Sequence, residues 1–429
     1  MKTLSLLSLC VACSPTSVKI GGLDDAGGFE SATADAPPID EGSSDPPTEE
    51  EEGEGEGEDP ANEGLAQWTI MVYLAGDNNL EDPALVDLNE MEIAGSTDEV
   101  NILVEIDRSE GYSSADGNWT GARRYLVEQD DNMDSIYSTA LEDLGEVDSG
   151  STDAYVDFIN WSVDNFPAEQ YALIIWNHGW GWTLAPINGR KGISSDDQSG
   201  NSISVANGEY EEILSAAADA TDNRLSMVGM DACLMANWEI ARLTAEYADV
   251  YVASQATESI AGWAFHTALT DLIESPEMDA VELGNAFAER FHETGDSTLS
   301  VVDLAELAEL DSAIDNFANS ILSKENPRSN VRPQARRAQN FDGDPNDKDF
   351  RDFLARMVSE TDDTEIADAS EALDAELDEA ILANFTNGGW VRDATGLSIY
   401  IPTNGFDGAY HDGRWNEFTR WGDVVDAIR

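Results

Sequence analysis

The stretch WTIMVYLAG, residues 68–76, is a nearly continuous run of apolar residues that ends in Asp77, Asn78 and Asn79. A run of this length without alternation predicts a strand that is buried on both faces, and the three polar residues after it favour a turn. Strands buried on both faces occur mainly in parallel sheets that carry helices on either side. This stretch therefore predicts an α/β fold.

Four further stretches have the same strand-like character. They are VNILVEID (100–107), YALIIWNHG (171–179), SMVGMDAC (226–233) and DVYVASQA (249–256). Between them, Ser151 starts a capped amphipathic helix, and we expect another helix over about residues 234–248. This alternation predicts a mainly parallel central sheet flanked by helices. From Val281 on, we expect a largely helical C-terminal portion with two strand candidates, 297–304 and 396–402.

The chain is strongly acidic. Its 429 residues include 87 Asp or Glu and 22 Lys or Arg, for a formal net charge of -65. Beyond residue 66 there are still 71 acidic against 20 basic side chains, so the acidity belongs to the folded part as well. This balance argues against a nucleic-acid-binding protein. Two causes stay open: attraction of cationic substrates, which salt screens beyond about 8 Å, or adaptation to salt.

The first 66 residues indicate export rather than folding. Residues 1–13, MKTLSLLSLCVAC, combine one lysine, an apolar run and a small residue before Cys13, as export signals do. The end of this run resembles a bacterial lipoprotein signal, so lipid anchoring through Cys13 and simple secretion both stay open. Residues 14–66 predict a disordered acidic linker. We therefore place the folded domain at 67–429 and expect an extracytoplasmic protein, anchored at the cell envelope or secreted.

Two of the predicted strand ends carry residues suited to nucleophilic catalysis. His178 follows one strand and precedes Gly179, and Cys233 stands where the next strand turns into the expected helix. Helix N-terminal amides would favour the Cys233 thiolate, and an imidazole on a neighbouring strand end could take and return its proton. The N–H groups of Gly179 and Cys233 could then hold an oxyanion. The alternative role for Cys233, the domain's only thiol, is an inert buried hydrophobe.

Six motifs together resemble the clostripain family of cysteine peptidases, in the family's order. They are WTIMVYLAGDNNLE (68–81), IIWNHGWGW (174–182), KGISSDDQSG (191–200), MDACLMANWEIA (230–241), SQATESIAGWAF (254–265) and GLSIYIP (396–402). The resemblance implies a caspase-like fold and a His178/Cys233 dyad that works through a thioester acyl-enzyme. It also implies cleavage of peptide or protein substrates after Arg or Lys.

Asp231 is the candidate for binding the substrate's basic side chain. Residues two apart in a strand project to the same side, so its carboxylate should lie near the Cys233 thiol. The resemblance implies that Asp231 pairs with the Arg or Lys before the scissile bond. The family's usual second acid falls here on Ala261, and Glu258 is a candidate to compensate. The alternative role for Asp231 is to cap the expected helix.

Arg190 and Lys191 are candidates for self-cleavage. They lie in NGRKG, a glycine-flanked stretch of the kind where chains are nicked. Members of the resembling family often mature by a cut between the histidine and the cysteine, and such a cut would fall after Arg190 or Lys191. The alternative is an ordinary basic loop.

No metal ligand is assigned from the sequence. FDGDPNDKD, residues 341–349, gathers Asp342, Asp344, Asn346 and Asp347 but lacks the glycine and the final glutamate of an EF-hand loop. It predicts a solvated acidic loop. The dyad chemistry requires no cofactor, and calcium stays open because some relatives use it.

Two other functions stay open. One is a non-catalytic cell-surface binding module that keeps the peptidase fold, for which the alanine at position 261 leaves room. The other is a Cys-dependent amide hydrolase or transpeptidase that uses the same dyad without basic specificity. The oligomeric state is not indicated by the sequence.

Overall fold

The computed structural model describes residues 64–182, 192–295, 297–341 and 345–429. The predicted export signal, nearly all of the linker, Cys13, Arg190 and Lys191 lie outside these residues. The central feature of the described chain is a nine-stranded sheet in the order β10-β8-β7-β6-β5-β1-β2-β3-β4. The strands are β1 (Ala66–Gly76), β2 (Val100–Arg108), β3 (Gly121–Leu126), β4 (Ala140–Gly145), β5 (Ala168–Trp176), β6 (Leu225–Asp231), β7 (Ala248–Ala253), β8 (Thr298–Asp303) and β10 (Ile381–Thr386).

The middle of this sheet is parallel, as predicted. β7, β6, β5, β1 and β2 run in one direction. β3 and β4 continue the sheet antiparallel at one edge, and β8 and β10 do so at the other. The predicted mainly parallel α/β sheet is therefore confirmed, with antiparallel strands added at both edges.

Helices cover both faces of the sheet. They are α1 (Glu81–Ala94), α2 (Thr152–Asn165), α3 (Glu209–Ala220), α4 (Trp238–Thr244), α5 (Phe265–Glu274) and α6 (Ala280–Glu293). Successive side chains of β1 point to opposite faces. Ile70, Val72 and Leu74 join the core with α1, α5 and α6, whereas Met71 and Tyr73 join the core with α2 and α3. The run at 68–76 is almost entirely apolar because both sides of β1 are buried.

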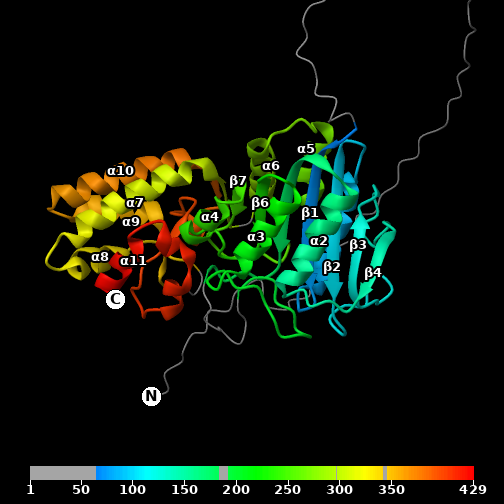
Figure 1. Cartoon of the computed structure of the whole chain (residues 1–429), viewed down its shortest axis with the longest axis horizontal. Coiled ribbons are helices and arrows are strands. Elements are labelled where there is room, and N and C mark those ends of the chain that lie inside the picture. The colour runs from blue at the N-terminus through cyan, green and yellow to red at the C-terminus, as the bar shows by residue number, and fades with distance from the viewer. Residues whose placement is uncertain (1–63, 183–191, 296, 342–344) are drawn as a thin grey trace, which may run out of the picture. The chain divides into compact units, whose positions relative to one another are not determined.

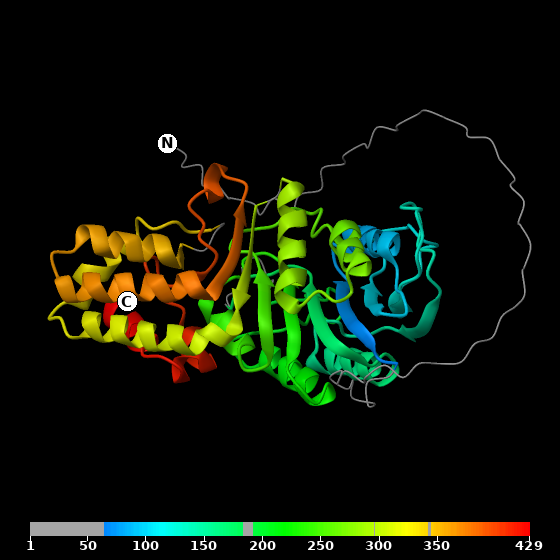
Figure 2. The same ribbon diagram turned by 90° about the horizontal axis from the view of Figure 1, so that it is seen from above.

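The C-terminal helices lie together at the opposite end of the molecule from β3 and β4 (Figure 1). They are α7 (Leu307–Leu322), α8 (Pro327–Ala335), α9 (Phe350–Glu360), α10 (Thr364–Ala380) and α11 (Trp421–Ile428). In Figure 2, α10 leads directly into β10 at the edge of the sheet. The predicted helical C-terminal portion is confirmed. No helix in the described ranges is long and apolar enough to cross a membrane.

A second, two-stranded sheet joins the C-terminal portion to the rest of the domain. It pairs β9 (Asp347–Asp349) with β11 (Ser398–Tyr400). The predicted strand at 396–402 therefore exists in part, but outside the central sheet. The Ser398 N–H donates to the Ala236 carbonyl at 2.9 Å. The C-terminal portion is thus hydrogen-bonded to the segment that follows Cys233.

Glu239 is a buried acid that links α4 to the C-terminal portion. Its carboxylate accepts hydrogen bonds from the Tyr400 N–H and the Tyr410 hydroxyl, both at 3.1 Å. Burial raises the pKa of Glu239 to about 7, although these hydrogen bonds oppose the rise. The pKa in the unfolded chain is lower, so the folded state favours the protonated side chain.

We expect Glu239 to make stability fall with rising pH. A raised folded-state pKa contributes stability that is fully present below the unfolded pKa and is lost as the pH rises through about 7. Glu239→Gln mimics the protonated acid. Between pH 5 and pH 8 the unmodified chain should lose about 2–3 kcal/mol more unfolding free energy than this variant.

Urea unfolding at both pH values measures this difference. Glu379→Gln, which changes an exposed acid on α10, is the matched control and should follow the unmodified chain. Identical pH dependence of Glu239→Gln and the unmodified chain would contradict the assignment.

Candidate active site

The pairing of β5 and β6 brings the two predicted catalytic residues to one edge of the sheet. Trp176, the last residue of β5, is in register with Asp231, the last residue of β6. His178 and Cys233 each stand two residues beyond this pair. Because the strands are parallel, both residues emerge at the same carboxyl edge, where sites form in sheets of this type.

Gly179 shows how closely the two segments approach. A Cβ at this position would lie 2.3 Å from the Cys233 carbonyl oxygen and 3.0 Å from the Cβ of Ala232. These distances leave no space for a side chain. The residue after His178 therefore packs directly on the backbone of Cys233, and glycine is required there.

His178 and Cys233 line the same pocket. They are only 4% and 7% exposed, respectively, yet both border this opening. Asp231 and Glu258, the two residues predicted to bind substrate, line it as well. The rest of the lining consists of Leu80, Pro83, Trp176, Asn177, Ala232, Ser259, Ile260 and Gly262. Tertiary structure thus gathers four predicted site residues around one pocket.

The surroundings of the Cys233 sulfur differ from the prediction. α4 begins at Trp238 rather than at about residue 234. Leu234 has a φ of 65°, in the left-handed region, and its N–H bonds to the Ala256 carbonyl at 3.0 Å, so no helix starts there. The predicted help from a helix N-terminus is therefore wrong. Instead, the backbone of Glu258 contacts Sγ of Cys233, with its N–H 3.4 Å and its carbonyl oxygen 4.0 Å from the sulfur.

A turn after β1 orients His178. Its Nε2 lies 3.1 Å from Oδ1 of Asn79. The turn itself is held by Asn78, whose side chain accepts the Leu80 N–H at 2.9 Å and donates to the Ala75 carbonyl at 2.9 Å. Sequence reasoning predicted this turn but did not identify Asn79 as a partner of His178.

Asp231 lies on the wall of the pocket and is 4% exposed. Its Oδ2 accepts the Trp263 N–H at 3.1 Å. The alternative role as a helix cap is wrong, because Asp231 ends β6 and α4 begins only at Trp238. Asp231 is thus a buried carboxylate on the wall of the pocket that Cys233 also lines.

A second carboxyl group, which the sequence did not single out, lies beside Asp231. It belongs to Asp87 on α1. A Cβ on Gly262 would lie 3.2 Å from an oxygen of Asp231 and 3.2 Å from an oxygen of Asp87. Trp176 donates its indole N–H to Asp87 Oδ2 at 2.6 Å. Burial, together with the charges of Asp231 and Glu90, raises the pKa of Asp87 well above its usual range.

The family's usual second acid is replaced in this chain by Ala261, and the structure describes this position. Ala261 lies in an exposed segment, next to the exposed Ile260. Gly262 follows it and faces the two carboxyl groups. The acid that accompanies Asp231 in this chain is thus Asp87, which comes from a helix far away in sequence. Only the tertiary structure could reveal it.

The acidic stretch at 341–349 is not the solvated loop that was predicted. Asp347 begins β9 and is buried. The Asn346 side chain accepts the N–H groups of Thr403 and Asn404 at 2.9 and 2.8 Å. Asp342 and Asp344 lie outside the described residues. Pairing with β11 accounts for the burial, because a strand in a sheet cannot stay solvated on all sides.

Comparison with known proteins shows which family the chain belongs to. A model of the clostripain family matches residues 72–407. Clostripain from Hathewaya histolytica is 28% identical over 189 residues, which cover 40% of this chain and 35% of that protein. The match thus spans about a third of the length of clostripain.

Two solved structures share the fold. A secreted C11 cysteine protease from Bacteroides thetaiotaomicron, in complex with an irreversible peptide inhibitor, superimposes with a TM-score of 0.63 at 20% identity, covering 84% of this chain and 99% of that one. An inactive zymogen C11 protease from Parabacteroides distasonis gives a TM-score of 0.58 at 19% identity, covering 84% and 98%. The predicted caspase-like α/β fold is confirmed. Since the family model matches most of its length, this chain belongs to the clostripain family of cysteine peptidases.

Proposed function

We propose that this chain is an exported cysteine endopeptidase that cleaves peptide bonds after Arg or Lys. One observation carries the proposal: His178 and Cys233 border a single pocket whose wall holds Asp231, with Asp87 beside it. A nucleophile, a base and a buried acid in one pocket, with a second acid beside that one, are the parts that this reaction needs.

The Cys233 thiolate attacks the carbonyl carbon of the scissile bond. His178 accepts the thiol proton and later returns it to the leaving amine, and water then hydrolyses the thioester. When Nε2 of His178 donates to Asn79, Nδ1 stays unprotonated and serves as the base. The N–H groups of Gly179 and Cys233 stabilise the oxyanion. The contact of Gly179 with the Cys233 backbone supports this pairing of amides.

Specificity comes from the two carboxyl groups. Asp231 and Asp87 lie close enough that their charges repel, and this repulsion contributes to the raised pKa of Asp87. A guanidinium or ammonium group entering the pocket would replace repulsion with attraction. Neutral side chains would leave the buried acids without compensation. The pocket is therefore selective for cationic residues, although the family's usual second acid is replaced by Ala261.

The proposal also places the domain outside the cytoplasm. The pattern at residues 1–13 and the acidic stretch after it favour a domain held outside the cytoplasm, either lipid-anchored through Cys13 or secreted. The relative from Bacteroides thetaiotaomicron is a secreted enzyme, which supports the same location.

Turnover should depend on both members of the dyad. Cys233→Ala should abolish cleavage of fluorogenic Arg and Lys peptides, and His178→Ala should lower kcat by about 10²–10⁴-fold, the usual contribution of a general base. Alkylation should inactivate the unmodified domain through Cys233, its only thiol. His411→Ala, a change at a histidine paired with Asp426, is the control and should retain activity.

The same assay separates the other functions. Absence of turnover with every peptide would support a non-catalytic binding module. Alkylation-sensitive turnover of neutral peptides alone would support an amide hydrolase or transpeptidase without basic specificity.

The acidic pair should control specificity rather than chemistry. Asp231→Asn should lower kcat/KM for Arg and Lys peptides by about 10²–10⁴-fold, because losing one partner of a buried ion pair costs about 3–5 kcal/mol. Asp87→Asn should lower it by about tenfold. Neither variant should reduce the small turnover of neutral peptides.

Asp82→Asn is the matched control for Asp87→Asn. Asp82 lies on the same helix but is exposed to solvent, so its loss should leave specificity unchanged. Equal losses with basic and neutral peptides in the two aspartate variants would show that these residues do not select the substrate.

We also propose self-cleavage after Arg190 or Lys191. Both lie between the catalytic residues in sequence, and the chain beyond them is firmly held, because Ile193 and Ile203 exchange two backbone hydrogen bonds of 2.8 Å. Intact-mass measurement of the purified protein should show two associated fragments, whereas Cys233→Ala should stay intact. An Arg190→Ala/Lys191→Ala double variant should also stay intact. A cut that is present in Cys233→Ala, or absent from the unmodified protein, contradicts self-processing.

A further inference from the structure

A buried glutamine lies where the segment after Cys233 meets the C-terminal portion. Gln255 follows β7 and is only 3% exposed. The carbonyl of the residue before it accepts the Ala236 N–H at 2.8 Å, and the carbonyl of the residue after it accepts the Leu234 N–H at 3.0 Å. Gln255 therefore stands between two backbone hydrogen bonds that join its own segment to the one that carries the thiol.

Three hydrogen bonds connect the Gln255 side chain to the C-terminal portion. Its amide nitrogen donates to Oδ2 of Asp349 at 3.1 Å and to the Ser398 hydroxyl at 3.2 Å. Its amide oxygen accepts the Gly396 N–H at 2.7 Å. Only the oxygen of an amide can accept an N–H, and only its nitrogen can donate to a carboxylate, so these partners fix how the amide is turned. One side chain thus reaches both β9, which ends at Asp349, and β11, which begins at Ser398.

Asp349, the acidic partner of Gln255, is itself firmly held. It is fully buried, and it accepts the Thr395 N–H at 2.7 Å, the Thr395 hydroxyl at 2.6 Å and the Asp352 N–H at 2.8 Å. Burial raises the pKa of Asp349 to about 6, although the hydrogen bonds from Thr395, Asp352 and Gln255 oppose the rise. The carboxylate is therefore mainly charged at neutral pH, and hydrogen bonds to charged acceptors are about twice as strong as neutral ones.

The segment that Gln255 holds continues to the sulfur of Cys233. Glu258, three residues later, contacts Sγ with its backbone nitrogen 3.4 Å and its carbonyl oxygen 4.0 Å away. Glu258 also lines the pocket together with His178 and Cys233. Three residues span at most about 11 Å, so a displacement of the backbone at Gln255 is carried into the wall of the pocket.

We infer that Gln255 is a positioning residue for the Cys233 thiol, which it serves by holding the backbone beside the sulfur against the C-terminal portion. Gln255 is absent from the described residues that line the pocket, so it acts through its neighbours and not on the substrate. The C-terminal portion thereby contributes to the reaction without supplying either member of the dyad. This role rests on the proposed use of Cys233 as the nucleophile and does not depend on a preference for Arg or Lys.

Gln255→Met tests this role, because it keeps the length of the side chain and removes its three hydrogen bonds. In the full chain this variant should lower kcat for an Arg peptide by about ten- to a hundredfold with little change in KM, since a misplacement of about 1 Å can cost about 10²-fold. Intact mass gives the cleaved fraction of each preparation, and rates are compared between preparations in the same state.

Alkylation measures the geometry of the dyad without a peptide. In the unmodified chain, His178→Ala should slow the reaction of Cys233 with iodoacetamide at about pH 6, because the imidazole no longer takes the thiol proton. With Gln255→Met in place, the same change should slow alkylation by about fivefold less, because the two groups are no longer held together. A purely structural role for Gln255 would leave the effect of His178→Ala unchanged.

Asp349→Asn approaches the same contact from the other side. It should lower kcat by about tenfold, and combining it with Gln255→Met should cost little more than the worse single variant, because both remove one interaction. Ser398→Ala removes only one partner of Gln255 and should lower kcat by about two- to tenfold. It keeps the test decisive if the other variants fail to fold.

Ser300→Ala is the matched control. The Ser300 hydroxyl is buried and donates to the carbonyls of Ala253 and Gly396 at 3.2 and 2.7 Å, so its loss weakens the same junction without releasing Gln255. This variant should melt below the unmodified chain, yet keep its kcat and the full effect of His178→Ala on alkylation.

Two results would overturn the inference. The first is a Gln255→Met variant that melts at a lower temperature but keeps the kcat and the His178→Ala effect of the unmodified chain, because Gln255 then only stabilises the fold. The second is a loss of kcat in Ser300→Ala as large as that in Gln255→Met, because any weakening of the junction then has the same effect. An unmodified chain that cleaves no Arg or Lys peptide, while His178→Ala and Gln255→Met still act on alkylation as expected, would instead contradict the proposed specificity alone.

Discussion

The in-register pairing of two parallel strands is the constraint on which the rest depends. β5 and β6 are buried on both faces, so neither can slip without exposing its apolar side chains. Their last residues, Trp176 and Asp231, are therefore level, and the chain beyond each must leave the sheet at the same edge. The contact of Gly179 with the Cys233 carbonyl shows how little space remains there. His178 and Cys233, far apart in sequence, thus line one pocket at this edge.

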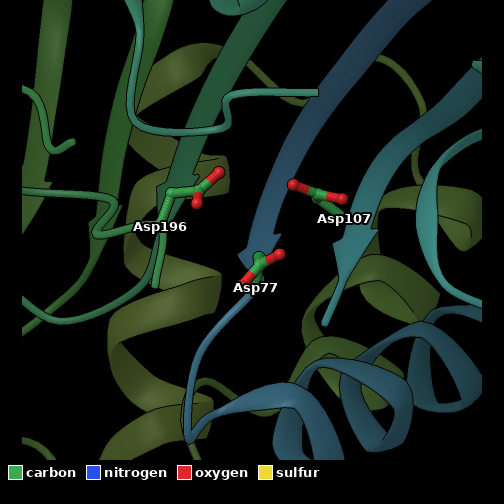
Figure 3. A group of neighbouring side chains, drawn as sticks. All are labelled: Asp77, Asp107 and Asp196. Carbon is green, nitrogen blue, oxygen red and sulfur yellow. The ribbon is translucent and has the colours of Figure 1, made fainter. Parts of the chain in front are cut away.

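The same edge concentrates buried negative charge in two places. One is the pair of Asp87 and Asp231 beside the dyad, and the other is the group of Asp77, Asp107 and Asp196 at the ends of β1 and β2 (Figure 3). Burial raises the pKa of carboxyl groups in both places. In each place the charged forms of neighbouring carboxyl groups repel one another away from water.

Cys233 does not stand at a helix N-terminus, although its position directly after β6 first indicates one. A strand followed by a helix places the helix N-terminus against the first residues of the turn, and that arrangement activates many thiols. Here Leu234 adopts a left-handed conformation, and the chain forms hydrogen bonds with the segment after β7 before α4 begins. The N–H of Glu258 then reaches the sulfur. The sulfur thus contacts the backbone of a neighbouring segment and not the start of a helix.

Much of this could be predicted from sequence, because a buried strand must be apolar on both faces and a parallel sheet must alternate strands with helices. These constraints are local, so the runs at 68–76 and 171–179 predict the central sheet, and the motifs around His178 and Cys233 predict the family. Asp87, Asn79 and the group at Asp77, Asp107 and Asp196 could not be found in this way. Each is an ordinary polar residue in its own helix, turn or strand, and only the register of the sheet and the packing of α1 and the 192–201 segment bring it to its partner. The start of α4 was missed for the same reason, since hydrogen bonds with a distant segment override the local preference for a helix.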